Sequence, residues 1–98
     1  MEHQVGEFVF AWDETKAEAN SAKHGVTFID AATVFADPLA RIYDDPDHSE
    51  NEQRCLLVGQ SFAGKILVVA HAGEGGRIRI ISAREATRTE RRSFEQDA

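Results

Sequence analysis

The chain has 98 residues, which is enough for one compact domain and too few for two. Hydrophobic residues make up 42% and charged residues 29%, a composition that excludes a wholly disordered chain. The single cysteine, Cys55, excludes an intrachain disulfide, and the longest apolar run, residues 66–70, is too short to span a membrane. The N-terminus lacks the basic and apolar regions of a signal peptide, so we expect one cytoplasmic domain over residues 1–98.

Charge is distributed unevenly along the chain. Lysine and arginine together number 11 against 17 acidic residues, which gives a net charge of −6. Residues 77–92 nevertheless contain six arginines and two glutamates, so this segment carries +4 and the rest of the chain −10. Such a segment either forms a solvated helix or attracts phosphate locally, and the acidic total excludes neither interpretation.

Local signals predict the elements of the first half. The alternation of residues 7–11 is typical of a short strand. Asp13 as N-cap and Gly25 as C-cap frame a helix of about 11 residues. Thr27 begins a second amphipathic helix with a capping-box pattern, and an Asp-Pro pair at positions 37–38 ends it.

The second half predicts mainly strands. We expect them at residues 39–43, 53–58, 65–71 and 77–82, with an acidic loop over 44–52. Ser82 and Glu85 have the spacing of a capping box and predict the start of a last helix. The expected fold is therefore α+β, with two N-terminal helices packed on one face of an antiparallel sheet and a C-terminal helix.

The predicted hairpins assign side chains to the two faces of the sheet. If both close symmetrically, residue 58 lies opposite 65 and residue 71 opposite 77. Arg54 and Arg79 then both lie across from Val69, and a slip of one residue would reverse the faces. One face forms the core with Cys55, Leu57, Ile66, Val68, Ala70, Ile78 and Ile80. The other carries Arg54, Leu56, Leu67, Val69, His71, Arg77, Arg79 and Ile81.

Three arginines and a histidine on one sheet face suit a polyanion. Arginine forks bind phosphate oxygens and histidine transfers protons, which are the groups that metal-independent RNA cleavage requires. The alternative is an ordinary solvent-exposed face. His24, in the last turn of the first predicted helix, has a structural alternative too, because its cation would interact favourably with the helix dipole. Metal-ligand spacings are not evident, so we expect no metal and no cofactor.

Several separate motifs occur in one order along the chain and together resemble the BrnT family of toxins. The resemblance extends from about Phe8 to Phe94. The motifs are Phe10-Ala-Trp-Asp13 with Lys16 and Asn20, Lys23-His-Gly-Val26 with Phe28, residues 31–38, Asp47-His-Ser-Glu50, Arg54, and Arg79-Ile-Ile-Ser-Ala-Arg84 with Ala86, Thr87 and Glu90.

The resemblance implies a RelE-like fold and a ribonuclease that arrests growth by blocking translation. It implies a BrnA-like ribbon-helix-helix antitoxin in a two-plus-two complex, with operator DNA contacted only through that antitoxin. Arg84 is expected to open the last helix, and Phe94 stands where family members commonly have tyrosine. The expected catalytic residues are His24, His71, Arg79 and Arg84, and the expected RNA-binding residues are Lys23, Arg54, Arg77 and Arg88.

A second function agrees with the same residues. The chain would then be a catalytically weak or degenerate toxin that acts mainly as a co-repressor with its antitoxin, and its arginine-rich helix would contact DNA phosphates or the antitoxin. An enzyme arrests growth when expressed alone, whereas a co-repressor binds operator DNA in a salt-sensitive way only with the antitoxin. A structural adaptor is a third alternative.

Overall fold

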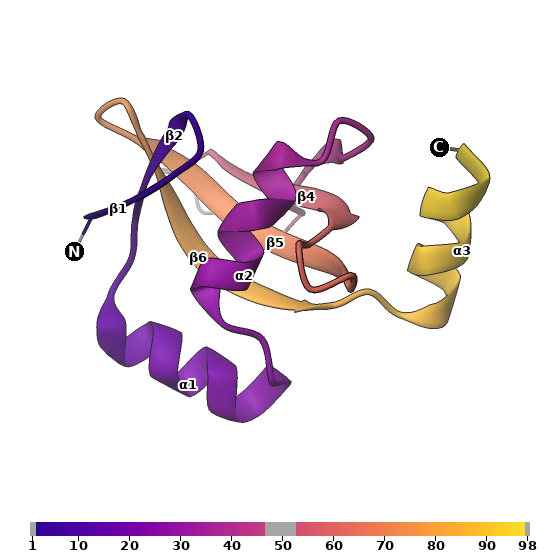
Figure 1. Cartoon of the computed structure of the whole chain (residues 1–98), viewed down its shortest axis with the longest axis horizontal. Helices are drawn as coiled ribbons and strands as arrows, with labels where there is room; N and C mark the ends of the chain where they lie inside the picture. The colour runs from indigo at the N-terminus through magenta and orange to yellow at the C-terminus, as the bar shows by residue number, and fades with distance from the viewer. Residues whose placement is uncertain (1, 47–52, 98) are drawn as a thin grey trace.

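A computed structural model describes residues 2–46 and 53–97, so most of the predicted acidic loop lies outside the described residues. Within them the chain forms one six-stranded sheet in the order β1-β2-β6-β5-β4-β3, together with helices on both sides of it (Figure 1). The elements are β1 (Glu2–Val5), β2 (Phe8–Ala11), α1 (Glu14–His24), α2 (Phe28–Thr33), the 3-10 helix η1 (Val34–Ala36), β3 (Arg41–Asp44), β4 (Arg54–Gln60), β5 (Ile66–Glu74), β6 (Arg77–Glu85) and α3 (Arg88–Asp97).

The first helix, α1, begins and ends at the predicted residues, whereas α2 begins as predicted but ends at Thr33, and the 3-10 helix η1 continues from there to Ala36. The Asp13 side chain accepts a hydrogen bond from the Lys16 backbone N–H at 3.0 Å, which caps α1. Gly25 ends α1 in the left-handed region at a φ of 68°. Thr27 Oγ1 accepts from the backbone N–H of Asp30 at 3.1 Å and caps α2. These ends are set by contacts within three or four residues, which is why the sequence predicts them.

The sheet is mixed rather than antiparallel throughout. β2 runs parallel to β6, with Phe10 opposite Ile78, while the other pairs of neighbouring strands are antiparallel. A parallel pair needs a long connection, and here two α-helices, a 3-10 helix and three strands separate β2 from β6 in the chain. β1, which the sequence pattern does not predict, pairs with β2 and forms the edge of the sheet.

The registers on both sides of β5 differ from the prediction. Val58 pairs with Val68, whereas the symmetric hairpin places it opposite Lys65. Glu74 pairs with Arg77 across a turn of two glycines, which shortens the predicted loop. Val58 thus pairs three residues further along than predicted, and so does His71, which pairs with Ile80 instead of Arg77. A register shift by an odd number of residues moves the side chains of a strand to the opposite face of the sheet. Because β5 shifts against both neighbours, β5 alone is reversed.

The β5–β6 turn explains the longer hairpin. Gly75 and Gly76 have φ angles of 58° and 81°. Positive φ at both central residues is typical of the tight two-residue turn whose twist matches that of paired strands. The hairpin therefore extends to the tip, and β5 and β6 each have nine residues.

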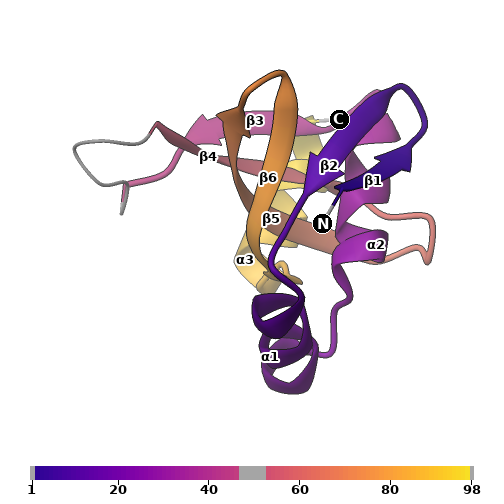
Figure 2. The ribbon, with the colours of Figure 1, turned by 90° about the vertical axis from the view of Figure 1, so that its left-hand side faces the viewer.

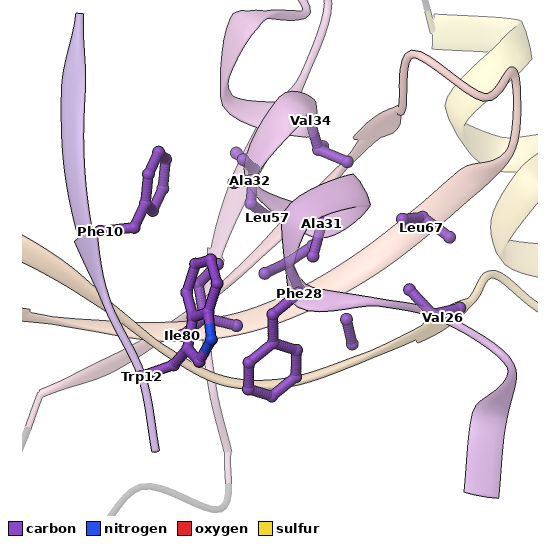
Figure 3. Packing of buried hydrophobic residues seen from close by; sticks show 12 residues of the cluster. Phe10, Trp12, Val26, Phe28, Ala31, Ala32, Val34, Leu57, Leu67 and Ile80 are labelled. Atoms are coloured by element: carbon purple, nitrogen blue, oxygen red, sulfur yellow. The ribbon is translucent and has the colours of Figure 1, made fainter. Parts of the chain in front are cut away.

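The core lies between α2 and one face of the sheet (Figure 3). Phe10, Phe28 and Val34 are fully buried there, together with Leu67 and Val69 of β5. Removal of each large side chain from water contributes about 1.5–3 kcal/mol. The prediction that Leu57 and Ile80 face the core is confirmed. The prediction that Ile66, Val68 and Ala70 of β5 do so is wrong, because of the register shift.

The last helix begins five residues later than predicted. Ser82 and Arg84 belong to β6, and the capping box is formed by Thr87 and Glu90. Thr87 N–H donates to Glu90 Oε1 at 2.8 Å, and Glu90 N–H donates to Thr87 Oγ1 at 3.2 Å. In Figure 2, α3 lies behind β5, away from α2 and the β1–β2 hairpin. In the part of the chain that the structure describes, no helix is long and apolar enough to cross a membrane.

Candidate functional site

A bulge in β6 brings distant arginines onto one face. Ala70 pairs with Ser82 and His71 pairs with Ile80, which leaves Ile81 as an extra residue in β6. Strand residues alternate between faces, so Arg79 and Arg84 would lie on opposite faces of a regular strand. The extra residue shifts the alternation by one position, so Arg79 and Arg84 lie on the same face of the sheet. This face lies opposite the core, and we call it the open face.

Arg54 joins these residues from β4. Arg54 and Arg79 both pair with Ala72, one on each side of β5, and directly opposed residues share a face. The predicted association of Arg54 with Arg79 is therefore confirmed, although Ala72 rather than Val69 lies between them. Arg54 Nε lies 3.7 Å from a carboxylate oxygen of the buried Asp45, and Arg79 Nε lies 3.4 Å from one of Glu74.

The open face contains a hollow of about 410 Å³. Its walls include Arg54 and Arg84, and Ser82 contributes a hydroxyl group. Two acidic residues also line it, Asp45 beside Arg54 and Glu90 beside Arg84. The rest of the lining is apolar and comes mainly from Leu56, Val68 and Ala70. An apolar surface flanked by guanidinium groups suits a ligand that combines phosphate with flat bases.

Arg84 forms the strongest ion pair of the hollow. Its Nη1 and Nη2 atoms lie 2.7 Å and 3.0 Å from the two carboxylate oxygens of Glu90. The hydrogen bonds from Arg84 lower the pKa of the Glu90 carboxyl to about 2. The same hydrogen bonds raise the pKa of Arg84. Both groups are therefore charged at physiological pH.

A smaller hollow of about 240 Å³ adjoins the first along β6. Lys23 and His24, at the end of α1, line it together with Ile81, and Ser82 lines both hollows. The end of α1 thus lies beside the bulge. The side chain of Asn20 positions this helix, because it accepts from the backbone N–H of Ala83 at 3.0 Å and donates to the Ala83 carbonyl at 2.8 Å.

His71 does not lie with the arginines. It projects from the reversed strand β5 toward the core, is only 7% exposed, and its ring packs edge-on against Phe35 with centroids 4.9 Å apart. Its predicted position beside Arg77 on the open face is therefore wrong. Burial lowers the pKa of His71, so its ring is neutral at physiological pH.

The free energy of unfolding is expected to fall as the pH decreases below about 6.5, in part because of His71. The unfolded chain protonates this histidine before the folded protein does, so acid favours the unfolded state. Urea unfolding at pH 7.5 and 5.5 measures the effect. His71→Leu should lose part of the difference between the two pH values. An unchanged difference in the His71 variant would contradict this role.

Two predicted RNA-binding residues lie outside both hollows. Arg77, at the β5–β6 turn, forms an ion pair with Glu2 and donates from Nε to the Glu74 carbonyl at 3.3 Å. Arg88 is the exposed first residue of α3. Phe94 is buried and lines an apolar hollow of about 390 Å³ with Leu56, so it packs against the open face.

Sequence reasoning left three site residues without a role, namely Ser82, Glu90 and Asp45. The Thr87-x-x-Glu90 spacing is itself a capping-box signal, so Glu90 was accessible to sequence analysis. The local signal at Ser82, a capping-box spacing, points to a helix rather than to a site, and Asp45 carries no local signal. The bulge brings Ser82 to the hollow, and the β3–β4 pairing brings Asp45. Among residues 2–46 and 53–97, no group of three or more histidine, cysteine or acidic side chains could hold a metal ion.

An α+β domain with an arginine-lined sheet face matches a known class of proteins. A family model described as the ribonuclease toxin BrnT of type II toxin–antitoxin systems matches residues 12–90. The chain therefore belongs to the BrnT family of ribonuclease toxins. The crystal structure of the Brucella abortus ribonuclease toxin BrnT is similar, with a TM-score of 0.62 and 27% identity over 81% of this chain and 96% of that chain. No curated protein matches the chain.

Proposed function

We propose that the chain is a metal-independent endoribonuclease toxin that cleaves RNA on the open face and so blocks translation. The observation that supports this site best is the β6 bulge, which aligns Arg79 and Arg84 on one face with Arg54. Arg54 and Arg84 line the 410 Å³ hollow, and Arg79 lies outside it on the same face. Guanidinium groups gathered on one face are what an RNA phosphate requires.

Each arginine has a role in this mechanism. Arg79 and Arg84 bind the scissile phosphate and stabilise the negative charge that develops on its oxygens, and Arg54 supports them. The ribose 2′-oxygen attacks phosphorus, the bond from phosphorus to the 5′-oxygen breaks, and a 2′,3′-cyclic phosphate forms. A base takes the proton of the 2′-hydroxyl, and an acid protonates the departing 5′-oxygen.

His24 is the histidine best placed for proton transfer. It lines the hollow that shares Ser82 with the arginine-lined hollow, and Lys23 adds positive charge there. His71 lies on the other face of the sheet, so we assign it to packing against Phe35. Phe94 cannot transfer a proton, so the mechanism proceeds without a tyrosine at that position. Arg77 and Arg88 contribute to the positive field around the RNA rather than to the scissile phosphate.

The partner of a type II toxin is an antitoxin. We propose a BrnA-like ribbon-helix-helix protein whose dimer holds two copies of the toxin, which has a RelE-like fold. Because the chain is acidic outside residues 77–92, a basic antitoxin surface would be electrostatically complementary to it. The complex would contact operator DNA through the antitoxin.

Expression of the chain in bacteria without antitoxin tests the function. Growth should stop and total RNA should be degraded, and co-expression of the antitoxin should restore growth. Purified protein should also cleave RNA in excess EDTA, which tests metal independence. Normal growth with folded protein would overturn the proposal that the chain is a ribonuclease. Salt-sensitive operator binding that requires the antitoxin would then support the co-repressor.

A further inference from the structure

The Arg84–Glu90 pair connects the last strand to the last helix, at the place where β6 leads into α3 (Figure 1). The carboxylate meets the end of the guanidinium group, because its two oxygens accept separately from Nη1 and Nη2. Nη1 also donates to the backbone carbonyl of Glu85 at 3.2 Å. Three of the five guanidinium hydrogens of Arg84 are thereby bound.

The two remaining hydrogens lie together on one edge of the group. They are the hydrogen on Nε and the second hydrogen on Nη2, and they have no hydrogen-bond partner among residues 2–46 and 53–97. A guanidinium edge with two parallel N–H groups has the geometry that binds two oxygens of one phosphate. Arg84 thus keeps a complete phosphate-binding edge while it is held by Glu90, and it lines the 410 Å³ hollow.

The carboxylate is itself held in place. Glu90 Oε1 accepts from the backbone N–H of Thr87 at 2.8 Å, in the first turn of α3. The pKa of Glu90, about 2, keeps the group ionised and makes it a poor base near neutral pH. The backbone at the start of α3 therefore fixes Glu90, and Glu90 fixes the plane of the Arg84 guanidinium.

We propose that Glu90 is a positioning residue, which holds Arg84 so that its free Nε and Nη2 edge is directed to the phosphate that is cleaved. The inference rests on the proposed ribonuclease site and adds a residue to it. Without Glu90, the long arginine side chain rotates among several conformers, and the phosphate meets a correctly oriented edge less often. Loss of the carboxylate should therefore reduce the cleavage rate more than the affinity for RNA.

The test is a double-mutant cycle in single-turnover cleavage at saturating protein. Glu90→Gln keeps the size of the side chain and one acceptor oxygen, and should lower the rate constant roughly tenfold or more. Its affinity for fully 2′-O-methylated RNA, which cannot be cleaved, should equal that of the wild type. Arg84→Gln should be slower still, and the double variant no slower than Arg84→Gln alone.

Two controls separate positioning from charge and from helix capping. Glu95→Gln makes the same charge change at an exposed site on α3 and should leave the rate unchanged. Thr87→Ala removes the hydroxyl that accepts from Glu90 N–H but keeps the ion pair, so it should lower the melting temperature and keep the rate.

Three results would overturn the proposal. Faster cleavage and tighter binding by Glu90→Gln would mean that Glu90 competes with phosphate. Wild-type cleavage by Glu90→Gln beside a slow Arg84→Gln would remove Glu90 alone and leave the ribonuclease site intact. Wild-type cleavage by Arg84→Gln would contradict both the role of Glu90 and the proposed ribonuclease site, because the RNA site would then lie elsewhere.

Discussion

Replacement of Arg79 with alanine should abolish growth arrest and lower RNA cleavage by about 100-fold, as does the loss of one preorganised charge-stabilising donor in other enzymes. Arg79 lies beside Ala72 on the open face, across β5 from Arg54. The pairing of β5 with β6 places its side chain in the same row of the sheet as Arg54, so its loss removes one of the two guanidinium groups of that row. Cleavage of total RNA and growth after induction measure the loss.

The control must separate this role from general attraction between the protein and RNA. Lys65→Ala removes one positive charge at an exposed position, where Lys65 Nζ lies 3.6 Å from a carboxylate oxygen of Glu85, and should keep toxicity. Urea unfolding of both variants checks that a loss of toxicity is not a loss of folded protein. Full toxicity of Arg79→Ala would show that the catalytic charge lies elsewhere.

Replacement of Asn20 with alanine should lower the free energy of unfolding by about 3 kcal/mol. Asn20 is buried, and its side chain donates to the carbonyls of Val26 and Ala83 and accepts from the N–H of Ala83. Alanine leaves these backbone groups buried without partners, and each such group costs about 1–3 kcal/mol. Total stability of a domain is only about 5–15 kcal/mol, so the change is large.

Urea unfolding checks this value, with Glu18→Ala as a control on the exposed side of the same helix. The control should change stability by less than about 0.5 kcal/mol. Asn20→Asp should also be destabilised, because a carboxylate can still accept from Ala83 N–H but would face two carbonyl oxygens. A loss below about 1 kcal/mol in Asn20→Ala would mean that water replaces the amide.

Asn20 also connects stability with the candidate site. Within residues 2–46 and 53–97, no strand pairs with β6 at the level of Ala83 on the α1 side, because β2 pairs with β6 at Ile78 and Arg79. The amide of Asn20 satisfies the strand there as a neighbouring strand would, and this holds the end of α1, with Lys23 and His24, next to Ser82. A motif residue that carries no chemistry thus sets the distance between the histidine and the arginines.

Prediction succeeded where the deciding contacts are local. The caps at Asp13, Gly25 and Thr27 act within one turn, so the bounds of α1 and the start of α2 follow from the sequence. The same holds for the family, because its motifs are short runs of residues in a set order, and the match over residues 12–90 confirms it. The predicted start of α3 was wrong because the chain has two capping-box spacings, one at Ser82 and one at Thr87. The pairing with β5 shows that β6 continues to Glu85, which excludes the first.

The prediction failed for the side chains of β5, whose face depends on whether the register shift is odd or even. The side-chain period of a strand is two, so a register error of three residues exchanges the faces of β5 and moves His71 from the arginine face to the core. Turn geometry sets the register, and the glycines of the β5–β6 turn allowed either a loop or a two-residue turn.

The sequence by itself therefore determined the family, the class of fold, the first two helices and the concentration of arginine near the C-terminus. Only the tertiary structure decided which of these arginines meet. The Ile81 bulge aligns Arg79 with Arg84, the pairing with Ala72 adds Arg54, and α3 brings Glu90 to Arg84. These contacts depend on strand pairing and helix docking, whose free energies are shared among many residues, and no short run of sequence specifies them.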